Sequence, residues 1–190
     1  MTQLLKQRST QKAIFINKKS TNPHLLTLGD ILPKIFIEIM KQAIKLILKE
    51  ETTFDLYFID GIVKRYDILS LADKFPQLNA LRNRDLFLQG KLLGWGGVIW
   101  NDELDISSDT VFDEGIDVSY EYDDIENVVI GYKIKQRRLE LNLSQSQLAE
   151  LVGIDQSDLS KIEKGNANPS IKTLVRIANG LNNKVSIDIL

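Results

Sequence analysis

The strongest constraint on this chain is a pair of short helices joined by a tight turn, with signals at both ends of each helix. Ser144 begins a capping box, because its hydroxyl can accept from a free N–H while Gln147 reaches back to the cap. Gly153 marks a sharp turn, and Asp155 is placed to cap the next helix. Gly165 supplies the left-handed residue that commonly ends a helix. The sequence therefore predicts a helix-turn-helix unit.

The second of these helices, expected over 156–164, has two unlike faces. Leu159 and Ile162 share the side that would pack against the preceding helix. The opposite side carries the polar or basic residues Gln156, Ser157, Ser160, Lys161 and Lys164. A short helix with a polar face, joined to another helix by a glycine-containing turn, has the form that fits the major groove of DNA.

Further helices extend this unit on both sides. Residues 127–141 are amphipathic and end before Asn142, which tolerates the left-handed backbone that closes a helix. Ser170 can cap a fourth helix over 171–179, which ends at Gly180. The last residues, 184–190, alternate apolar and polar side chains as a strand does.

A lone strand at 184–190 would leave its edge unpaired, so it needs a partner. Pairing with the same strand of a second copy is the solution that we favour, and it predicts a homodimer. The alternative is that this strand docks onto a sheet formed by the N-terminal part of the same chain.

The pattern from Leu143 to Ala178, L-S-Q-x-x-L-A-x-x-x-G-[IV]-x-x-x-x-L-S-x-I-E-x-G, followed by x-x-x-P-[ST]-x-x-T-L-x-x-I-A, resembles the Cro/lambda-repressor (Xre) helix-turn-helix family. This resemblance implies DNA base reading by Gln156, Ser157, Ser160 and Lys161. It implies contacts to DNA phosphates by Gln145, Arg137, Lys164, Asn166 and Asn168. It also implies an internal salt bridge between Arg138 and Glu163, which keeps both residues out of the DNA site.

The N-terminal half predicts an antiparallel sheet. Residues 43–49 alternate as a strand does, although 31–42 fit a helix as well as a strand. Asp60-Gly61 lies between the alternating runs 54–59 and 62–66, which is a strong hairpin signal. In such a two-residue turn we expect a positive φ at both Asp60 and Gly61.

Two more elements are expected before the acidic part of the chain. Residues 73–84 predict one or two short helices, and 87–100 predict a second pair of strands separated by glycines. Residues 101–115 are expected to form a loop and a helical turn that is capped by Ser108 or Asp109.

This half resembles a small bacterial α+β domain family of unknown biochemical function, over about residues 43–115. The matching positions are Asp60-Gly61, Asp67, Arg84, Leu86-Phe87, Trp100, Asp105 and Ser107. The resemblance implies an antitoxin-like component with a protein partner, a toxin, that binds residues 31–120. It implies no catalytic residues.

Charge is divided unevenly along the chain. The net charge is −2, yet the residues from 130 onward carry nine Lys or Arg against six Asp or Glu. Residues 102–126 hold eleven acids and no base, which is typical of a solvated surface leading into a linker. The alternative is that this stretch lies against the basic helices and competes with phosphate.

An enzyme is not expected. The acidic candidates are Asp102, Glu103, Asp105, Asp109, Asp113 and Glu114, and they lack the spacing of a calcium loop. The only histidine, His24, has no second candidate ligand, so we expect no metal and no cofactor. The absence of cysteine excludes thiol chemistry and fits a reducing cytoplasm, and no apolar run reaches membrane-spanning length.

We therefore expect an α+β protein: a small antiparallel-sheet domain, then an all-α lambda-repressor-like domain with a C-terminal strand. The expected segments are an extension at 1–30, the α+β domain at 31–120, an acidic linker at 121–127 and the helix-turn-helix domain at 128–190. The expected function is that of a cytoplasmic DNA-binding repressor that autoregulates its operon as an antitoxin, binding a pseudo-palindromic operator in double-stranded DNA. The alternative is a protein-interaction module that the helix-turn-helix only tethers to DNA.

Overall fold

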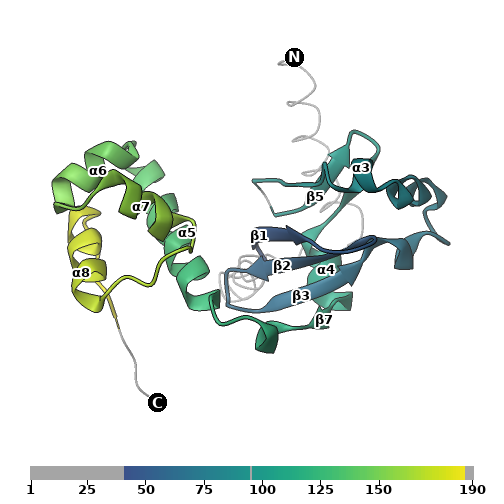
Figure 1. The fold of residues 1–190 in the computed structure, drawn as a ribbon, viewed down its shortest axis with the longest axis horizontal. Coiled ribbons are helices and arrows are strands. Elements are labelled where there is room, and N and C mark those ends of the chain that lie inside the picture. Colours follow the sequence, from purple (N-terminus) through teal and green to yellow (C-terminus); the bar gives the residue numbers. More distant parts are fainter. Residues whose placement is uncertain (1–40, 95, 187–190) are drawn as a thin grey trace, which may run out of the picture. The chain divides into compact units, whose positions relative to one another are not determined.

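The computed structural model describes residues 41–94 and 96–186, which all lie within the second of two units of the chain, 37–190. In this described part, two small antiparallel sheets are followed by a run of four longer helices (Figure 1). The predicted α+β class, with a sheet region ahead of a helix-turn-helix region, is confirmed. The predictions for 1–40, including His24 and most of the helix-or-strand alternative at 31–42, lie outside the described residues.

The first sheet has the strand order β1-β2-β3-β7, and all its neighbours are antiparallel. The strands are β1 (Ala43–Leu48), β2 (Thr53–Phe58), β3 (Val63–Asp67) and β7 (Ile116–Asp117). The first strand and the hairpin that follows it were predicted and are confirmed.

The hairpin loop is longer than predicted. It comprises 59–62, and only Gly61 has a positive φ, of 89°. The expectation of a positive φ at Asp60 is wrong. The Asp60 carboxylate accepts from the Ile62 N–H at 3.1 Å, so this side chain closes the turn without a left-handed backbone.

The second sheet has the order β4-β5-β6, with strands β4 (Lys91–Leu92), β5 (Val98–Asn101) and β6 (Leu104–Ile106). The predicted strand pair is confirmed but is shorter, because Phe87 ends the short helix α3 (Arg84–Phe87). Two 3-10 helices, η1 (Ile68–Leu71) and η2 (Pro76–Arg82), precede α3.

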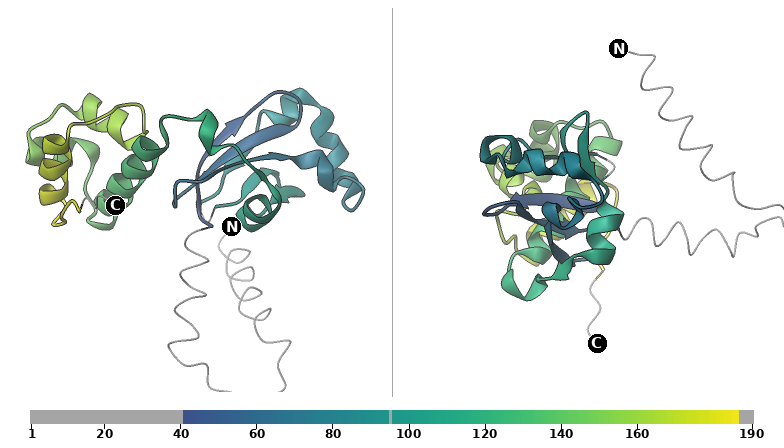
Figure 2. Two further views of the ribbon diagram at one scale, coloured as in Figure 1. Left: turned by 90° about the horizontal axis from the view of Figure 1, so that it is seen from below. Right: turned by 90° about the vertical axis from the view of Figure 1, so that its right-hand side faces the viewer.

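Residues 101–115 contain more regular secondary structure than the loop and helical turn that were expected. They include β6 and the helix α4 (Ser108–Glu114), which lies beside β3 (Figure 2). The N-cap of α4 is Ser107, whose hydroxyl accepts from the Thr110 N–H at 3.2 Å, so the predicted cap at Ser108 or Asp109 is wrong. The error is one of register, because Ser108 is already the first residue of the helix and the extended cap conformation is taken by Ser107, one residue earlier.

Strand β2 packs two different sets of residues on its two faces. Phe54, Leu56 and Phe58 lie in the main core, where they join the buried side chains of the second sheet, α3 and α4. Tyr57 points to the other face and packs with a smaller cluster that includes Ile125. The period of two that predicted the strand therefore places apolar side chains on both sheet faces.

The second face also holds a buried carboxylate, Asp55. The Arg65 guanidinium donates to both of its oxygens, at 2.8 and 2.9 Å, and the Tyr122 hydroxyl donates as well. Burial alone would raise the pKa of Asp55, but these hydrogen bonds and the Arg65 and Lys49 charges hold that pKa below its usual value. Asp55 is therefore a paired anion that ties β2 to β3 and to the segment around Tyr122.

Several acids of the stretch 102–126 pair with cations in and beside the first sheet. The pairs are Lys41 with Asp113 at 2.5 Å, Lys45 with Asp124 at 3.0 Å, and Arg65 with Glu121 at 2.7 Å. Within the described part of the chain, the salt bridges of these acids are made with this sheet region and not with the helices that follow. The stretch thus neutralises sheet cations, as expected of an ordinary charged surface.

The four helices that follow are α5 (Ile125–Glu140), α6 (Gln145–Val152), α7 (Gln156–Glu163) and α8 (Ile171–Gly180). Asn142 has a φ of 55°, Gly153 of 64° and Gly165 of 73°, so the predicted left-handed stops are confirmed. Both halves of the Ser144 capping box are made. Asp155 occupies the N-cap position of α7 in an extended conformation, but its side chain makes no capping hydrogen bond.

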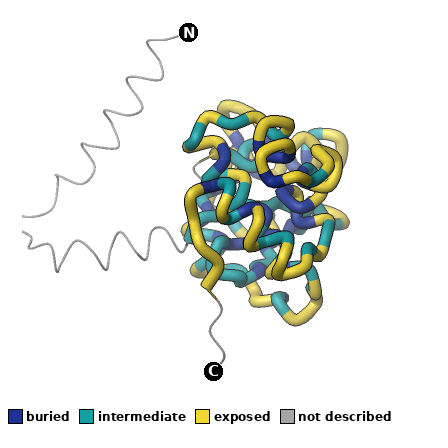
Figure 3. The backbone as a smooth tube through the Cα atoms, turned by 90° about the vertical axis from the view of Figure 1, so that its left-hand side faces the viewer, coloured by how far each residue is buried: buried dark blue, intermediate teal, exposed yellow. Residues whose placement is uncertain are grey.

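Helix α5 contributes to two hydrophobic clusters. Ile125 and Val128, in its first turns, pack with Tyr57 of the sheet. Ile134, further on, packs with the helix-turn-helix core of Leu148, Ala149, Val152, Leu159, Ile162, Ile177 and Leu181. At the start of α5, buried residues recur every three positions, at Ile125, Val128 and Gly131, and Figure 3 shows buried stretches alternating with exposed ones along the backbone. The segment expected as a linker, 121–127, includes the start of α5, and its Tyr122 and Asp124 are bonded to side chains of the sheet.

The predicted C-terminal strand is not observed in the residues that can be described. Lys184–Ser186 belong to no helix or strand, and 187–190 lie outside the described residues. Val185 is 37% exposed, so an apolar side chain of this segment remains accessible.

Candidate nucleic-acid interface

Helix α7 is held by its apolar side, which leaves its polar side open. Leu159 is fully buried and Ile162 is 5% exposed, and both lie in the core formed with α6 and α8. Gln156, Ser157 and Lys161 are exposed and Ser160 is half-buried. The structure therefore brings together the four residues predicted to read bases, on one outward face of one helix.

A chain of hydrogen bonds connects this face to the interior of the domain. The Gln156 amide donates to the Gln145 side-chain oxygen at 2.8 Å, and the Gln145 amide donates to Glu163 at 2.9 Å. Glu163 in turn accepts two hydrogen bonds from Arg138, at 2.6 and 2.8 Å. Both ends of the Gln145 amide are thus fixed, and Gln145 holds the first residue of α7 in place.

The Arg138–Glu163 ion pair is the buried end of this chain. Its side chains are 7% and 1% exposed, and Arg138 also donates to the Leu143 carbonyl at 2.7 Å. Hydrogen bonds from the Arg138 guanidinium to the Glu163 carboxylate raise the pKa of Arg138 above its usual value. The salt bridge implied by the family resemblance is therefore present, and it joins α5, the α5–α6 loop and α7.

Lys161 is exposed on the surface of α7. Its ammonium lies 3.0 Å from the Asp158 carboxylate, one turn earlier, and both side chains are more than half exposed. An exposed pair of this kind contributes little to stability, so Lys161 can exchange Asp158 for another anion at small cost.

The residues predicted to grip the DNA backbone after α7 are also exposed. Lys164 is the C-cap of α7, and Asn166 and Asn168 follow in the loop before α8. The Asn166 N–H donates to the Lys161 carbonyl at 2.9 Å, which fixes the path of this loop past Gly165.

Arg137 occupies a different environment from the other predicted phosphate ligands. Its guanidinium donates to the Leu181 carbonyl at 3.3 Å and to Glu140 at 2.9 Å. Arg138, its neighbour in the chain, turns toward Glu163 instead. The structure therefore connects Arg137 to the end of α8. Gln145, in contrast, is bonded to two residues of α7, Gln156 and Glu163.

Two positions that support this face were not singled out from the sequence. Arg176 of α8 donates to the carbonyls of Val152 and Gly153, at the end of α6. Gly131 of α5 lies where a Cβ would collide with the backbone of Ile162. A glycine inside an amphipathic helix is a recognisable signal of close packing, whereas nothing local distinguishes Arg176 from a solvated arginine.

Within residues 41–94 and 96–186, no group of three or more His, Cys, Asp or Glu side chains is placed to hold a metal ion. None of the helices described is both long enough and apolar enough to cross a membrane.

Comparison with known proteins places the similarity in the same region. A helix-turn-helix family model matches residues 134–190. An immunity repressor protein of Bacillus phage phi105 is 41% identical over 59 residues, which are 31% of this chain and 41% of the repressor. This chain therefore spans less than half the length of that relative.

Two further relatives are matched over more of their own length. The restriction-modification controller protein C.AhdI from Aeromonas hydrophila aligns with 30% identity and a TM-score of 0.31, over 31% of this chain and 89% of that one. An uncharacterized HTH-type transcriptional regulator of Archaeoglobus fulgidus is 38% identical over 53 residues, which are 28% of this chain and 75% of the regulator. With the family match over 134–190 and this likeness to 75% of the length of an HTH-type regulator, the chain belongs to the helix-turn-helix family of the Cro/lambda-repressor (Xre) type.

Proposed function

We propose that this protein is a sequence-specific DNA-binding transcriptional regulator that acts as a repressor. The observation that carries this proposal is the outward face of α7, where Gln156 is held in place by Gln145 and is free on its other side. A glutamine amide can bond to adenine through two hydrogen bonds, and serines such as Ser157 accept several bases. Membership of the family points to a DNA-binding regulator rather than an enzyme.

Affinity would come mainly from contacts to phosphate. Gln145 lies in the first turn of α6, where free N–H groups favour an anion, and Lys164, Asn166 and Asn168 follow α7. The residues from 130 onward carry a net charge of only +3. A weakly basic domain of this size binds DNA more tightly when two copies bind together. The repressor would therefore act as a homodimer on a pseudo-palindromic operator, with half-sites about 34 Å apart.

The finer biological role that we propose is autoregulation of an operon in which the protein serves as antitoxin. One relative is named as an immunity repressor, which supports repression. A toxin partner would bind within 31–120. Ile116 is 70% exposed in β7 and Tyr120, just after that strand, is 85% exposed, so two large apolar side chains lie open beside a sheet edge.

The recognition face can be tested by replacing its two most informative residues. We expect Gln156→Ala and Lys161→Ala each to weaken binding to the preferred sequence by about 1–3 kcal/mol. The preferred sequence would first be selected from a random pool of duplex DNA with the full-length protein. Binding to that duplex and to an unrelated one would then be measured by titration at one fixed salt concentration.

Lys172→Ala is the matched control, because Lys172 is an exposed lysine of α8 that lies outside the α7 face. It removes the same charge and should leave sequence preference unchanged. If Gln156→Ala and Lys161→Ala both keep the wild-type preference, α7 is not the reading helix. If the wild-type protein selects no sequence at all, the proposed function itself is wrong.

Gln145→Ala should have two effects. It removes a phosphate contact, which lowers affinity for all duplexes, and it releases the Gln156 amide, which relaxes discrimination at the base that Gln156 reads. We expect a loss of about 1 kcal/mol on every sequence and a further loss on the preferred one alone. Ser146→Ala, at an exposed neighbour in α6, is the control. An equal loss on all sequences would assign Gln145 to the phosphates alone.

A further inference from the structure

Helix α6 ends in a left-handed turn that satisfies only part of its backbone. The N–H groups of Gly153 and Ile154 donate back to the carbonyls of Glu150 and Ala149, at 3.2 and 3.0 Å. The last carbonyls of a helix have no donor within it, because the residues that would supply one have left the helical path. At the end of α6 these include the carbonyls of Val152 and Gly153, which need donors from another part of the molecule.

Arg176 of α8 supplies those donors. Its Nε donates to the Val152 carbonyl at 3.0 Å, and its Nη2 donates to the carbonyls of both Val152 and Gly153. A guanidinium holds its N–H groups in one rigid plane, so it fixes the two carbonyls relative to each other as well as to α8. Its positive charge also suits the C-terminal end of a helix.

Two glycines make room for this contact. A Cβ at Gly153 would lie 3.0 Å from the Nη2 of Arg176, so a side chain at the turn would press on the guanidinium. Gly180 follows Arg176 by four residues and lies on the same side of α8. A Cβ at Gly180 would collide with the Val152 side chain. The end of α6 therefore lies close against the side of α8 that carries Arg176.

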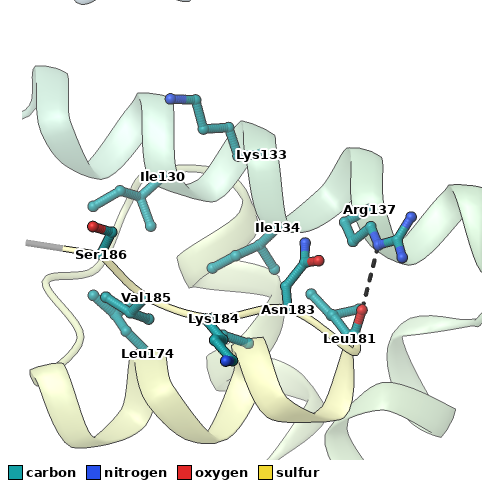
Figure 4. A pocket seen from close by; sticks show the side chains of 11 residues that line it. Ile130, Lys133, Ile134, Arg137, Leu174, Leu181, Asn183, Lys184, Val185 and Ser186 are labelled. Atoms are coloured by element: carbon teal, nitrogen blue, oxygen red, sulfur yellow. Dashed lines mark hydrogen bonds between the residues drawn. The ribbon is translucent and has the colours of Figure 1, made fainter.

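Helix α8 provides a fixed base for Arg176. Ile177 is fully buried and Leu181 is 2% exposed, and both lie in the core shared with α6 and α7. The Leu181 carbonyl also accepts from Arg137, which ties the end of α8 to α5 (Figure 4). A donor on α8 can therefore set the position of the turn instead of moving with it.

The reading helix begins immediately after the carbonyls that Arg176 binds. Residues 154 and 155 alone separate Gly153 from Gln156, the first residue of α7. The side chain of Asp155 makes no capping hydrogen bond, so the start of α7 is not held by a side-chain cap. It is held by the Gln145 side chain, which accepts from Gln156 at 2.8 Å, and through the backbone by Arg176.

Base contacts are more sensitive to the position of α7 than phosphate contacts are. A hydrogen bond to a base edge weakens steeply when its angle or distance departs from the normal range. Phosphate contacts depend on charge and are spread along the DNA backbone, so a small shift of the protein costs them little. Movement at the start of α7 should therefore reduce affinity for the preferred sequence more than affinity for unrelated DNA.

We propose that Arg176 is a positioning residue for sequence recognition: it fixes the α6–α7 turn from α8 and so sets where Gln156 and Ser157 meet the bases. It acts through the turn and not by binding DNA, because its donors are directed to carbonyls of the protein. This inference rests on the proposed DNA-binding regulator. It assigns part of the sequence preference to a residue outside both helices of the helix-turn-helix.

The test compares two substitutions in the full-length protein. Arg176→Lys keeps the charge but cannot hold two carbonyls in one plane, and Arg176→Met removes both the charge and the donors. Binding to the selected duplex and to an unrelated duplex would be titrated over a range of salt concentrations. We expect the ratio of the two affinities to fall about tenfold in Arg176→Met and about threefold in Arg176→Lys. The salt dependence of binding to unrelated DNA should not change, because no phosphate contact is lost.

Lys172→Met is the matched control, because Lys172 is exposed and lies one turn before Arg176 on the same side of α8. It removes the same charge and should keep the wild-type ratio. A direct phosphate contact by Arg176 predicts a different result. Arg176→Met would then weaken binding to both duplexes equally and reduce the slope of log affinity against log salt by about 0.9, while Arg176→Lys would lose little. That result would overturn the positioning role.

Amide hydrogen exchange of the free protein separates an effect on the turn from a general loss of stability. The Ile154 N–H should exchange faster in both variants, while the Leu148 N–H, near the start of α6, should keep close to its wild-type rate. Equal acceleration at both amides, with an unchanged affinity ratio, would mean that Arg176 only stabilises the fold. If circular dichroism shows that Arg176→Met does not fold, Arg176→Lys decides the test alone.

The positioning role and the proposed function fail in different ways. Wild-type protein that selects a sequence, with both variants keeping the wild-type affinity ratio, would overturn the role of Arg176 and leave the regulator in place. Wild-type protein that selects no sequence would overturn the regulator itself, and the positioning role with it.

Discussion

Replacing Arg138 by alanine is expected to lower the free energy of unfolding by about 3–5 kcal/mol. The substitution leaves the Glu163 carboxylate buried without its counter-ion and removes the donor to the Leu143 carbonyl. It also releases the far end of the hydrogen-bond chain that positions Gln145 and Gln156, so sequence discrimination should fall with stability. Urea denaturation followed by circular dichroism measures the first effect, and DNA titration the second.

The neighbouring arginine supplies a matched control. Arg137→Ala removes the same functional group one residue away, but the Arg137 partners are an exposed glutamate and one carbonyl. It should cost no more than about 1 kcal/mol. The double variant Arg138→Met, Glu163→Met removes both buried charges and should regain much of the stability that Arg138→Ala loses. Equal losses for Arg137→Ala and Arg138→Ala would contradict a special role for the buried pair.

After Arg138→Ala, we expect Gly131→Ala to lower the free energy of unfolding the most. Alanine stabilises the interior of a helix by about 1 kcal/mol relative to glycine, so this substitution would make α5 more stable if the helix stood alone. A Cβ at Gly131, however, would lie inside contact distance of the Ile162 carbonyl oxygen and 3.1 Å from the Glu163 carbonyl carbon. Overpacking costs about 1–3 kcal/mol, and here the neighbour is backbone that cannot rotate away. We expect a net loss of about 2 kcal/mol and weaker DNA binding, because the last turn of α7 must move.

Gly94→Ala is the appropriate comparison for Gly131→Ala. A Cβ at Gly94 meets no atom within 4 Å, and its φ does not require glycine. Its unfolding midpoint in urea should stay close to that of the wild type. If Gly131→Ala is more stable than the wild type, α5 and α7 are not in the close contact described.

The parts of the fold that were predicted correctly depend on a few neighbouring residues. The capping box of Ser144 and Gln147, and the left-handed stops at Asn142, Gly153 and Gly165, follow from chemistry within one helical turn. The hairpin around Gly61 belongs to the same group. Its turn type was wrong because two-residue and four-residue loops can carry the same Asp-Gly signal.

The parts that were missed depend on residues far apart in the chain. Arg137 and Arg138 are adjacent and chemically identical, and they point about 100° apart on α5. Only the positions of Glu163 and Leu181 decide that one is buried and the other binds the end of α8. The hydrogen bonds of the Gln145 amide are likewise made with partners 11 and 18 residues away in the chain. The family resemblance named Glu163 as the partner of Arg138, but nothing in the sequence named Leu181 as the partner of Arg137, or Gln156 and Glu163 as the partners of Gln145.

Helix α5, which supplies side chains to two hydrophobic clusters, restricts how this protein can change its length during evolution. One inserted residue between Val128 and Ile134 would rotate the two halves of the helix by about 100° relative to each other and shift them by about 1.5 Å along the axis. Either Val128 would leave the cluster around Tyr57, or Ile134 would leave the cluster of α6, α7 and α8. Insertions and deletions should therefore accumulate in loops such as 59–62, while the spacing within α5 stays constant.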